Sequence, residues 1–381
     1  MHPPHSRVHA EGFRICQKLS CGKGASSVEY SPTSYSSREN GEPRSMMTHE
    51  DNTAGARVSA ARDWVKILSA YREPDALRSS FELAVTVGAF VLLWAVAWYA
   101  MSISALLAFV ISLCNAAFLL RLFIIQHDCG HSAFFKNRVL SDWLGRVIGI
   151  VTLTPYDVWR ASHALHHSSS GNLGRRGMGD VHTLTVAEYK ARSPLKRLLY
   201  RLYRHPLVLF GLGPGYLFFL ENRLPLGLTG RAKYWVSSMV TNAMICLALS
   251  VIYYFGGIMP ILLIFLPSTL LAASAGVWLF YVQHQFEDTH WEADKDWDLH
   301  DAALHGSSHY VLPSVLQWLS GNIGIHHVHH LYSRIPFYRL PEVLRDHDSL
   351  ASSNHMTIRQ SFRSTRLHLW DEDSKKLVAF G

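Results

Sequence analysis

The sequence predicts an all-α integral membrane protein with two transmembrane helical hairpins, four spans in total, and a cytoplasmic helical cap that carries a histidine-rich site for two metal ions. Three observations predict this class. Four long apolar runs are arranged in two pairs, lysine and arginine residues are concentrated between the pairs, and three histidine clusters lie near the ends of the runs. The composition agrees, because 49% of the 381 residues are hydrophobic and only 17% are charged.

The four apolar runs are each long enough to cross a bilayer. About 20 residues, with a rise of about 1.5 Å per residue, span a hydrocarbon core of roughly 30 Å. A soluble helical hairpin would show polar residues at every third or fourth position, and these runs almost lack them. We therefore expect membrane spans at about residues 81–101, 102–125, 235–255 and 258–282.

Two shorter apolar stretches are not expected to cross the membrane. Residues 147–153 are too few, and residues 206–220 are interrupted by glycine and proline. Both stretches are typical of interfacial or re-entrant segments. A single crossing by either one would place the histidine clusters on opposite sides of the membrane.

The distribution of positive charge predicts the orientation. The turns near residues 102 and 257 contain no lysine or arginine, whereas the segment between the two hairpins contains many of both. By the positive-inside rule that segment is cytoplasmic. An even number of crossings then places both termini and all three histidine clusters on the cytoplasmic side.

The N-terminal residues differ from the rest of the chain. Residues 1–60 are rich in serine, arginine, histidine and glutamate, and they lack the apolar core of a signal peptide. We expect a disordered tail, or a true start at Met46 or Met47, which leaves open whether residues 1–45 are translated. The expected organisation is a tail at 1–60, a membrane domain at 61–375 and a C-terminal tail at 376–381.

The three histidine clusters supply enough ligands for two metal ions. The first has the form HxxxH and the other two have the form HxxHH; their members are His127 and His131; His163, His166 and His167; and His326, His329 and His330. Residues three or four apart share a helix face, so each cluster can direct two or three imidazoles at one point. Eight nitrogen ligands are too many for one tetrahedral zinc ion and indicate two transition-metal ions. His327 is left out because it points about 100° away from His326 on a helix.

Long stretches around the clusters carry more information than the clusters themselves. They read FIIQHDCGHSAFFKN, HALHHSSSGNLGRRGMGDVHTLTVAEY, YRLYRHPLVLFGLGP, GVWLFYVQHQFEDTHW, ALHGSSHYVLPSVLQWLSGNIGIHHVHHLYSRIP and LHLWDED. Together they resemble the membrane fatty acid desaturases, specifically the bacterial acyl-lipid desaturases of the delta-5 and delta-12 (omega-6) type. The resemblance covers about residues 80–375. The clusters alone are shared with related hydroxylases, ketolases and alkane monooxygenases.

The resemblance implies a set of site residues. The eight cluster histidines would bind two iron ions, and His284, just after the last span, would complete the set. Asp128 follows a ligand and is a candidate to accept the second N–H of a bound imidazole. Asn322, four residues before His326, is a candidate to hold a water molecule there. No catalytic residue beyond the metal ligands is expected.

The resemblance also implies the reaction and its partners. O2 and external electrons would be used to remove hydrogens from adjacent methylenes of a membrane-lipid acyl chain, giving a cis double bond. The chain has no His-Pro-Gly-Gly haem motif and no GxGxxG fingerprint, so a separate ferredoxin, flavodoxin or similar carrier should bring the electrons. The candidate docking residues, which equally suit contact with lipid headgroups, are Arg175, Arg176, Lys196, Arg197, Arg201 and Arg204. No nucleic-acid partner is expected, and the expected location is the bacterial inner membrane.

Two other classes of function remain open. The same centre can hydroxylate or ketolate a lipid or a carotenoid, although the flanking stretches disfavour this. A zinc-dependent membrane hydrolase or a metal transporter is also disfavoured, because a transporter needs ionisable residues at mid-membrane and the predicted spans have none near their centres. The sequence leaves open the double-bond position, the carrier of the acyl chain (phospholipid, acyl carrier protein or coenzyme A) and the oligomeric state.

Overall fold

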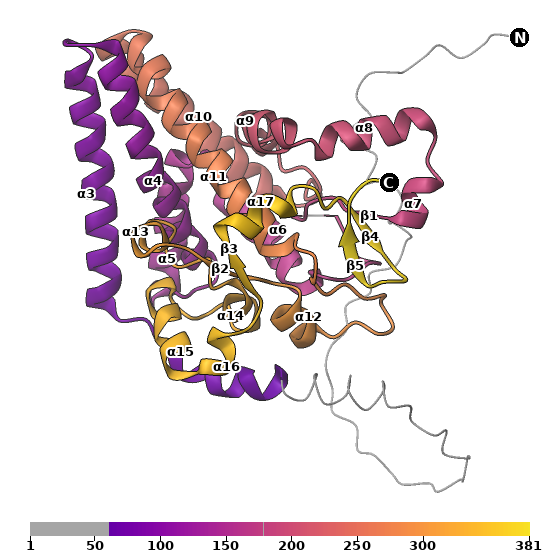
Figure 1. Cartoon of the computed structure of the whole chain (residues 1–381). Coiled ribbons are helices and arrows are strands. Elements are labelled where there is room, and N and C mark those ends of the chain that lie inside the picture. The colour runs from indigo at the N-terminus through magenta and orange to yellow at the C-terminus, as the bar shows by residue number, and fades with distance from the viewer. Residues whose placement is uncertain (1–60, 178) are drawn as a thin grey trace, which may run out of the picture. The chain divides into compact units, whose positions relative to one another are not determined.

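The computed structural model describes residues 61–381 with the exception of Met178. The expected N-terminal tail at residues 1–60, with the alternative start sites Met46 and Met47, lies outside the described residues. The described part is mostly helical, as expected. Long helices stand next to one another, and a cap of short helices and two small sheets surrounds one end of them (Figure 1).

Four helices are long and apolar enough to cross a membrane, which confirms the four predicted spans. They are α3 (Ala76–Ala100), α4 (Ala105–Gly130), α10 (Ala232–Gly256) and α11 (Leu266–His284), the last preceded without a break by the π-helical segment η4 (Ile261–Phe265). The first two begin at capping side chains. Asp75 accepts from the backbone N–H of Arg78, and Ser104 accepts from that of Leu107. The helix α3 therefore starts before the apolar run that predicted it.

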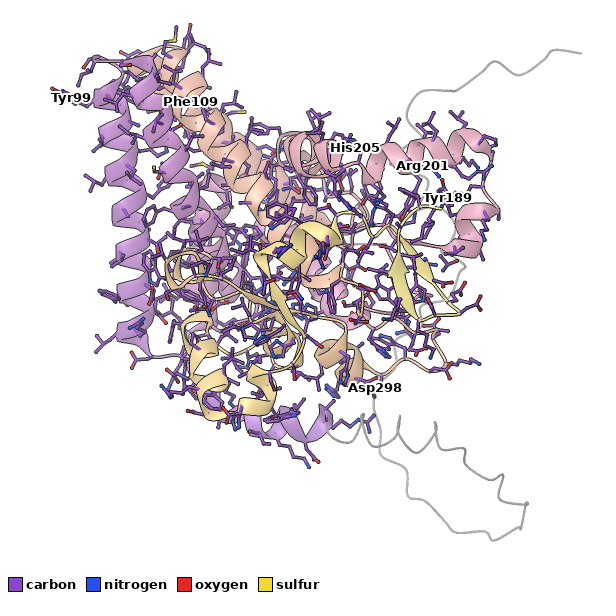
Figure 2. The ribbon with its side chains drawn as sticks, in the orientation of Figure 1. Tyr99, Phe109, Tyr189, Arg201, His205 and Asp298 are labelled. Atoms are coloured by element: carbon purple, nitrogen blue, oxygen red, sulfur yellow. The ribbon has the colours of Figure 1, made fainter. Side chains whose placement is uncertain are left out.

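The helix α4 is the central element of the membrane part. Half of its most apolar window is buried, against 17% for α3, and it packs against α3, α11 and α5 (Arg138–Val151). Tyr99 and Phe109 lie near the α3–α4 turn, far from the cap (Figure 2). Tyr99 is exposed there, as is typical of aromatic side chains at a membrane–water interface. The opposite, enclosed end of α4 carries the first histidine cluster.

The two shorter apolar stretches do not form spanning helices, as expected. Residues 147–153 belong mostly to α5, and residues 206–220 form the π-helical segment η2 (Val208–Leu212) and α9 (Gly213–Phe219). Among the described residues, neither is one of the helices that are long enough to span. Several apolar side chains of α5 are nevertheless exposed, including Val139 and Trp143, which is typical of a helix that lies at a membrane surface.

The cap is built from short helices that precede or follow the spans. They are η1 (Ser69–Tyr71), α6 (Tyr156–Ser169), α7 (Val186–Lys190), α8 (Pro194–Arg204), η3 (Glu221–Arg223), α12 (Leu299–His305), α13 (Ser314–Leu319), α14 (His326–Leu331), η5 (Phe337–Arg339), α15 (Leu340–Asp346), α16 (Asp348–Ala351) and α17 (Ile358–Ser364). One buried cluster that includes Val328, Ile335 and Val343 joins α14 to α15. Short helices of this kind depend on tertiary packing, because isolated helices of such length are unstable in water.

Two small sheets, which the sequence did not predict, tie the C-terminal part to the cap. One has the order β1 (Leu184–Thr185), β4 (Leu369–Asp371), β5 (Lys376–Val378), and the other pairs β2 (His309–Val311) with β3 (His355–Thr357) in parallel. The expected tail at 376–381 is therefore corrected. Its first three residues form β5, antiparallel to β4, and Leu377 is 1% exposed because it packs beside Trp291 and Trp370.

Candidate metal centre

Four helices deliver the predicted histidines to one region of the cap. The first cluster ends α4, the second lies on α6 and the third forms most of α14. His284 is the last residue of α11. Because α4 and α11 are spans and the other two helices belong to the cap, the region lies where the membrane part meets the cap.

The nine histidines form two groups. In each group the nearest ring nitrogens all lie within 4.8 Å of one another, a spacing suited to holding one metal ion. The five-histidine group comprises His127, His131, His163, His167 and His329, and the four-histidine group comprises His166, His284, His326 and His330. The second and third clusters contribute to both groups. The rings of His167 and His330 stack at 4.1 Å between centroids, so the groups are adjacent.

The nitrogens at the centre of each group are close enough to bind the same metal ion. In the five-histidine group the Nε2 atom of His163 lies 3.0 Å from that of His131 and 3.1 Å from that of His167. In the four-histidine group the Nε2 atom of His284 lies 3.1 Å from that of His166 and 3.0 Å from that of His326. A neutral imidazole has one N–H and one lone pair, so metal binding can use these lone pairs together.

The electrostatics of the groups fits a metal. Burial, with the neighbouring histidines, holds the pKa of His163, His167 and His329 well below its usual value, so these imidazoles are neutral near pH 7. Metal ligation requires neutral imidazole. In the described part of the chain, the Nε2 atom of His330 is buried without a hydrogen-bond partner, and a metal ion would satisfy it. The residues present therefore fit two metal ions.

Two carboxylates contact histidines of the groups. Asp180 lies with Oδ1 2.5 Å from Nδ1 of His166, which leaves Nε2 of that ring to face the four-histidine group. Oδ1 of Asp128 lies 3.4 Å from Nδ1 of His127, and its Oδ2 accepts from the backbone N–H of Phe337 at 2.7 Å. Carboxylates in this position orient a ligand ring and raise its basicity. Asp128 therefore connects the ring of His127 to the loop at Phe337.

Asn322 lies at a tight turn before α14. Its side-chain N–H donates to the backbone carbonyl of Phe337 at 3.1 Å, and its φ is +54°. The preceding Gly321 also has a positive φ, and a Cβ there would lie 2.6 Å from Ile124 of α4. The pair thus forms the tight turn that brings the chain to α14. Asn322 and Asp128 therefore both contact the backbone of Phe337.

Trp159 is a neighbour of the site that the sequence analysis did not single out for this role. Its indole stacks on His163 with 4.7 Å between centroids and an interplanar angle of 16°. A Cβ at Gly130 would lie 2.8 Å from the indole, so the first cluster needs glycine at this position. The signal in the sequence was the spacing of four residues that puts Trp159 and His163 on one face of α6.

Other histidines lie outside both groups. His327 donates through Nε2 to the carbonyl of Leu350 at 2.9 Å, in keeping with its exclusion from the predicted ligands. His305 lies with Nδ1 2.9 Å from Asp301. His182 is half-buried against Tyr200, and burial lowers its pKa to about 4.

The six candidate docking cations do not form one exposed cluster. Arg204 is 1% exposed and donates to Gln285 and to the carbonyl of Leu367, so its assignment to a docking surface is corrected. Arg176 is paired with Glu188. Three cations remain on α8, with Lys196 and Arg201 exposed and Arg197 half-buried, and Arg175 pairs with Asp294 at the surface. Arg201 lies beside Tyr189 in the cap (Figure 2).

A buried ion pair joins the spans to the cap. Arg121 of α4 pairs with Glu82 of α3, and both side chains are 1% exposed. The guanidinium also donates to the backbone carbonyl of Trp318 and lies 4.0 Å from the centroid of its ring. Arg121 precedes His127 by six residues, so the ion pair anchors the segment that carries the first cluster.

Comparison with known proteins gives a consistent result. The family model described as "Fatty acid desaturase" matches residues 104–362. A "Fatty acid desaturase" of Bacillus subtilis (strain 168) is 44% identical over 316 residues, which is 83% of this chain and 89% of that protein. An "sn-1 acyl-lipid omega-3 desaturase (ferredoxin)" of Synechocystis sp. is 27% identical over 233 residues, 58% of this chain and 61% of the relative. An "sn-1 oleoyl-lipid 12-desaturase" of the same genus is 25% identical over 238 residues, with 57% and 62% coverage.

Proposed function

The chain belongs to the fatty acid desaturase family, and on this premise we propose that it inserts a cis double bond into acyl chains of membrane lipids with a di-iron centre held by the nine histidines. The observation that carries this proposal is the division of those histidines into two adjacent groups. Each group offers at least four nitrogen ligands, which suits one transition-metal ion in each. Bound iron would supply the redox chemistry, in which O2 and external electrons remove two hydrogens from adjacent methylenes and water is released.

The residues of this chain prepare the site for that chemistry. Burial keeps His163, His167 and His329 neutral, and it excludes bulk water from the four-histidine group, whose members are at most 9% exposed. Asp180 and Asp128 orient His166 and His127 so that one nitrogen of each ring is presented inward. The spans α4 and α11 deliver the site to the membrane boundary, where an acyl chain can reach it from the lipid phase.

The lipid substrate is supported by the relatives. Two of them carry names that specify acyl-lipid or oleoyl-lipid substrates. The chain spans about 61% of the length of the first of these relatives. We place the chain in the inner membrane as a multi-pass protein with both termini and the histidines on the cytoplasmic side, as charge distribution indicates.

A separate electron carrier is part of the proposal, and ferredoxin, flavodoxin or a similar acidic protein suits it. Two relatives are named as ferredoxin-dependent enzymes. The cations of α8 that remain available are Lys196, Arg197 and Arg201. The same helix exposes Leu195 and Leu202, a pattern that also suits a helix lying on lipid, with its cations at the headgroups.

Charge reversal on α8 decides between those two roles. The double change Lys196→Glu with Arg197→Glu should raise the carrier concentration needed for half-maximal rate if α8 docks the carrier, and added salt should weaken the coupling in the unchanged enzyme. Iron content should stay the same. Unaltered carrier dependence, together with weaker binding of the protein to anionic lipid, would assign the helix to the membrane surface.

The proposed activity is tested in a host that lacks polyunsaturated lipids. Mass spectrometry with double-bond localisation should find acyl chains with one additional double bond at a single position, and none in cells that produce the His167→Ala variant. Metal analysis of the purified protein should find two irons per chain. A hydroxylated or ketolated product would contradict the desaturase assignment, and zinc as the bound metal would favour a non-redox function.

A further inference from the structure

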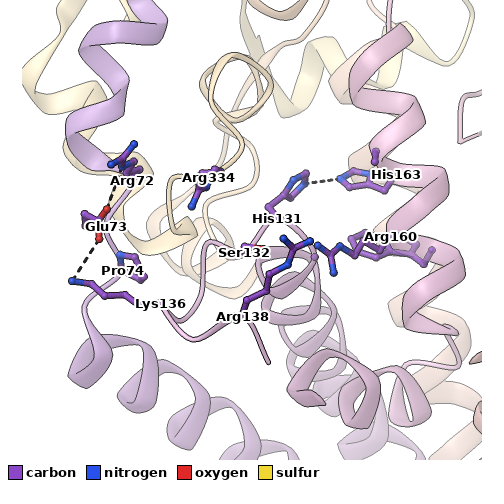
Figure 3. Close-up of a pocket in the computed structure, with 13 residues that line it drawn as sticks. Arg72, Glu73, Pro74, His131, Ser132, Lys136, Arg138, Arg160, His163 and Arg334 are labelled. Atoms are coloured by element: carbon purple, nitrogen blue, oxygen red, sulfur yellow. Dashed lines mark hydrogen bonds and ion pairs between the residues drawn. The ribbon is translucent and has the colours of Figure 1, made fainter. Parts of the chain in front are cut away.

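A cavity of about 560 Å³ opens at the five-histidine group. His131 and His163 form part of its wall (Figure 3), and Trp159 of α6 also lines it. The other walls come from the segment before α3, the loop after α4 and the loop after α14. A molecule in this cavity would therefore contact two of the proposed metal ligands from outside.

The cavity is strongly basic. Its lining has one carboxylate, Glu73, and five cations, namely Arg72, Lys136, Arg138, Arg160 and Arg334. Glu73 lies 3.2 Å from Arg72 and 3.5 Å from Lys136, which neutralises part of that side. Arg160 pairs at 2.8 Å with Asp142, which is not among the residues that line the cavity.

Two of the five cations have no carboxylate partner in the described part of the chain. Arg138 and Arg334 are exposed, and across residues 61–381 apart from Met178 neither has an ion pair or a side-chain hydrogen bond. Figure 3 shows the guanidinium of Arg138 turned toward that of Arg160, below His131. Like charges that converge on one cavity raise its positive potential and favour an anion there.

The position of the cavity identifies the source of the anion. Arg138 is the first residue of α5, and the next turns of that helix expose Val139, Trp143 and Val147, at 67%, 62% and 57%. Pro74, on the other wall, directly precedes Asp75, the N-cap of the span α3. The cavity therefore lies at the level where the spans end and lipid headgroups begin.

We propose that this cavity binds the phosphate of the phospholipid whose acyl chain is the substrate. This proposal rests on the proposed function and adds the headgroup that the enzyme recognises. Guanidinium groups suit phosphate because their N–H donors match two phosphate oxygens. The phosphate would sit between Arg138, Arg160 and Arg334, with the glycerol and acyl chain beside Trp159. A docked protein surface would need a much larger flat area, roughly 800 Å² per partner, whereas these cations surround a hollow.

The variant Arg138→Ala with Arg334→Ala tests the proposal, since both side chains are exposed and their loss disturbs no pairing. Rates are measured in dodecyl maltoside micelles with the acyl chain that the wild-type enzyme desaturates, attached either to phosphatidylglycerol or to diacylglycerol. We expect the KM for the phosphatidylglycerol substrate to rise roughly tenfold. The KM for the diacylglycerol substrate and the carrier dependence should not change. Arg138→Lys with Arg334→Lys should show an intermediate KM, and Arg359→Ala with Arg363→Ala, exposed cations of α17, serves as the matched control.

Binding of phosphatidylglycerol, measured by native mass spectrometry, separates this proposal from the proposed function because it needs no turnover. Weaker retention of that lipid by the Arg138→Ala/Arg334→Ala variant than by the control variant supports the cavity as a phosphate site, even if no desaturation is found. Unchanged retention and unchanged KM would overturn it. A rise in the carrier requirement alone would also overturn it, because the cations would then dock the electron carrier.

Discussion

Within the third histidine cluster, neighbouring side chains face different surroundings. His326 and His330 belong to the four-histidine group and His329 belongs to the five-histidine group, while His327 donates to Leu350. Successive residues of an α-helix are rotated by about 100°, so one short helix can serve both groups and still direct one histidine away. The HxxHH spacing therefore separates the proposed ligands from His327.

Alanine substitutions test this separation. His329→Ala should abolish activity and reduce the iron content, because it removes a nitrogen from the five-histidine group. His327→Ala should keep two irons and substantial activity, although the Leu350 carbonyl loses its donor at a cost of about 1–3 kcal/mol in stability. Iron analysis and thermal unfolding of the purified proteins check both results. Equal iron loss in the two variants would show that the geometry of α14 has been misinterpreted.

The residue that orients His166 allows a second comparison. Asp180 contacts Nδ1 of that ring, whereas Glu188, another acid of the same region, pairs with Arg176 and caps α7. Asp180→Asn should lower iron affinity or activity about 10- to 100-fold, the usual effect of losing such a carboxylate. Glu188→Gln is the matched control and should retain iron. The prediction fails if a chelator removes iron equally fast from Asp180→Asn and from the unchanged protein.

At the scale of elements, one ion pair holds two spans and a cap helix together. Glu82 of α3 accepts from both Arg78 and Arg121, and Arg121 also reaches the end of α13 at Trp318. A charge left alone in such an enclosed place is costly, whereas replacing both partners with apolar residues is often tolerated. Replacing one residue of the pair should therefore destabilise the protein more than replacing both.

This difference can be measured by thermal unfolding in detergent. Arg121→Met leaves Glu82 buried without its main partner and should destabilise the fold by about 3–5 kcal/mol. The double variant Glu82→Met with Arg121→Met should be more stable than Arg121→Met alone. Arg78→Met, which removes the half-exposed partner, should have an effect below about 1 kcal/mol. A double variant less stable than the single one would show that the charges contribute net stability as a pair.

At the scale of the whole molecule, the proposed site requires a single arrangement in the membrane. The first two clusters and the third are separated by the second pair of spans, so they can meet only if that pair crosses and returns. The two ends of the described part, residues 61 and 381, must then lie on the same side as the histidines. We propose that this side is the cytoplasm, as the positive-inside rule predicts.

Cysteine labelling from outside the cell tests the arrangement. Ser102→Cys and Met259→Cys, both exposed at the turns of the hairpins, should react with an impermeant reagent. Lys196→Cys on α8 should react only after the membrane is opened. The background variant must replace Cys114 and Cys246, which are exposed on the spans. Labelling of Lys196→Cys in intact cells would contradict both the topology and the shared metal centre.

The parts of the fold that depend on residues close together in the sequence were predictable. The four spans follow from runs of apolar residues, and the observed helices differ from the expected ones mainly at capping residues such as Asp75. Both small sheets were missed, because strands of two or three residues carry too little pattern to be recognised. The burial of Arg204 was not foreseen either, because its acceptors on Gln285 and Leu367 are distant in the sequence.

The sequence by itself determined which histidines share helix faces, because helical spacing is a local property of the chain. Only the tertiary structure decided how they are divided, with His166 facing His284 and His326 while His163 and His167 face the first cluster. It also decided that Asp180 orients His166, and that Arg138 and Arg334 meet at one cavity. The physical reason is that these contacts depend on how α4, α6, α11 and α14 cross, and the crossing is set by the packing of residues far apart in the sequence.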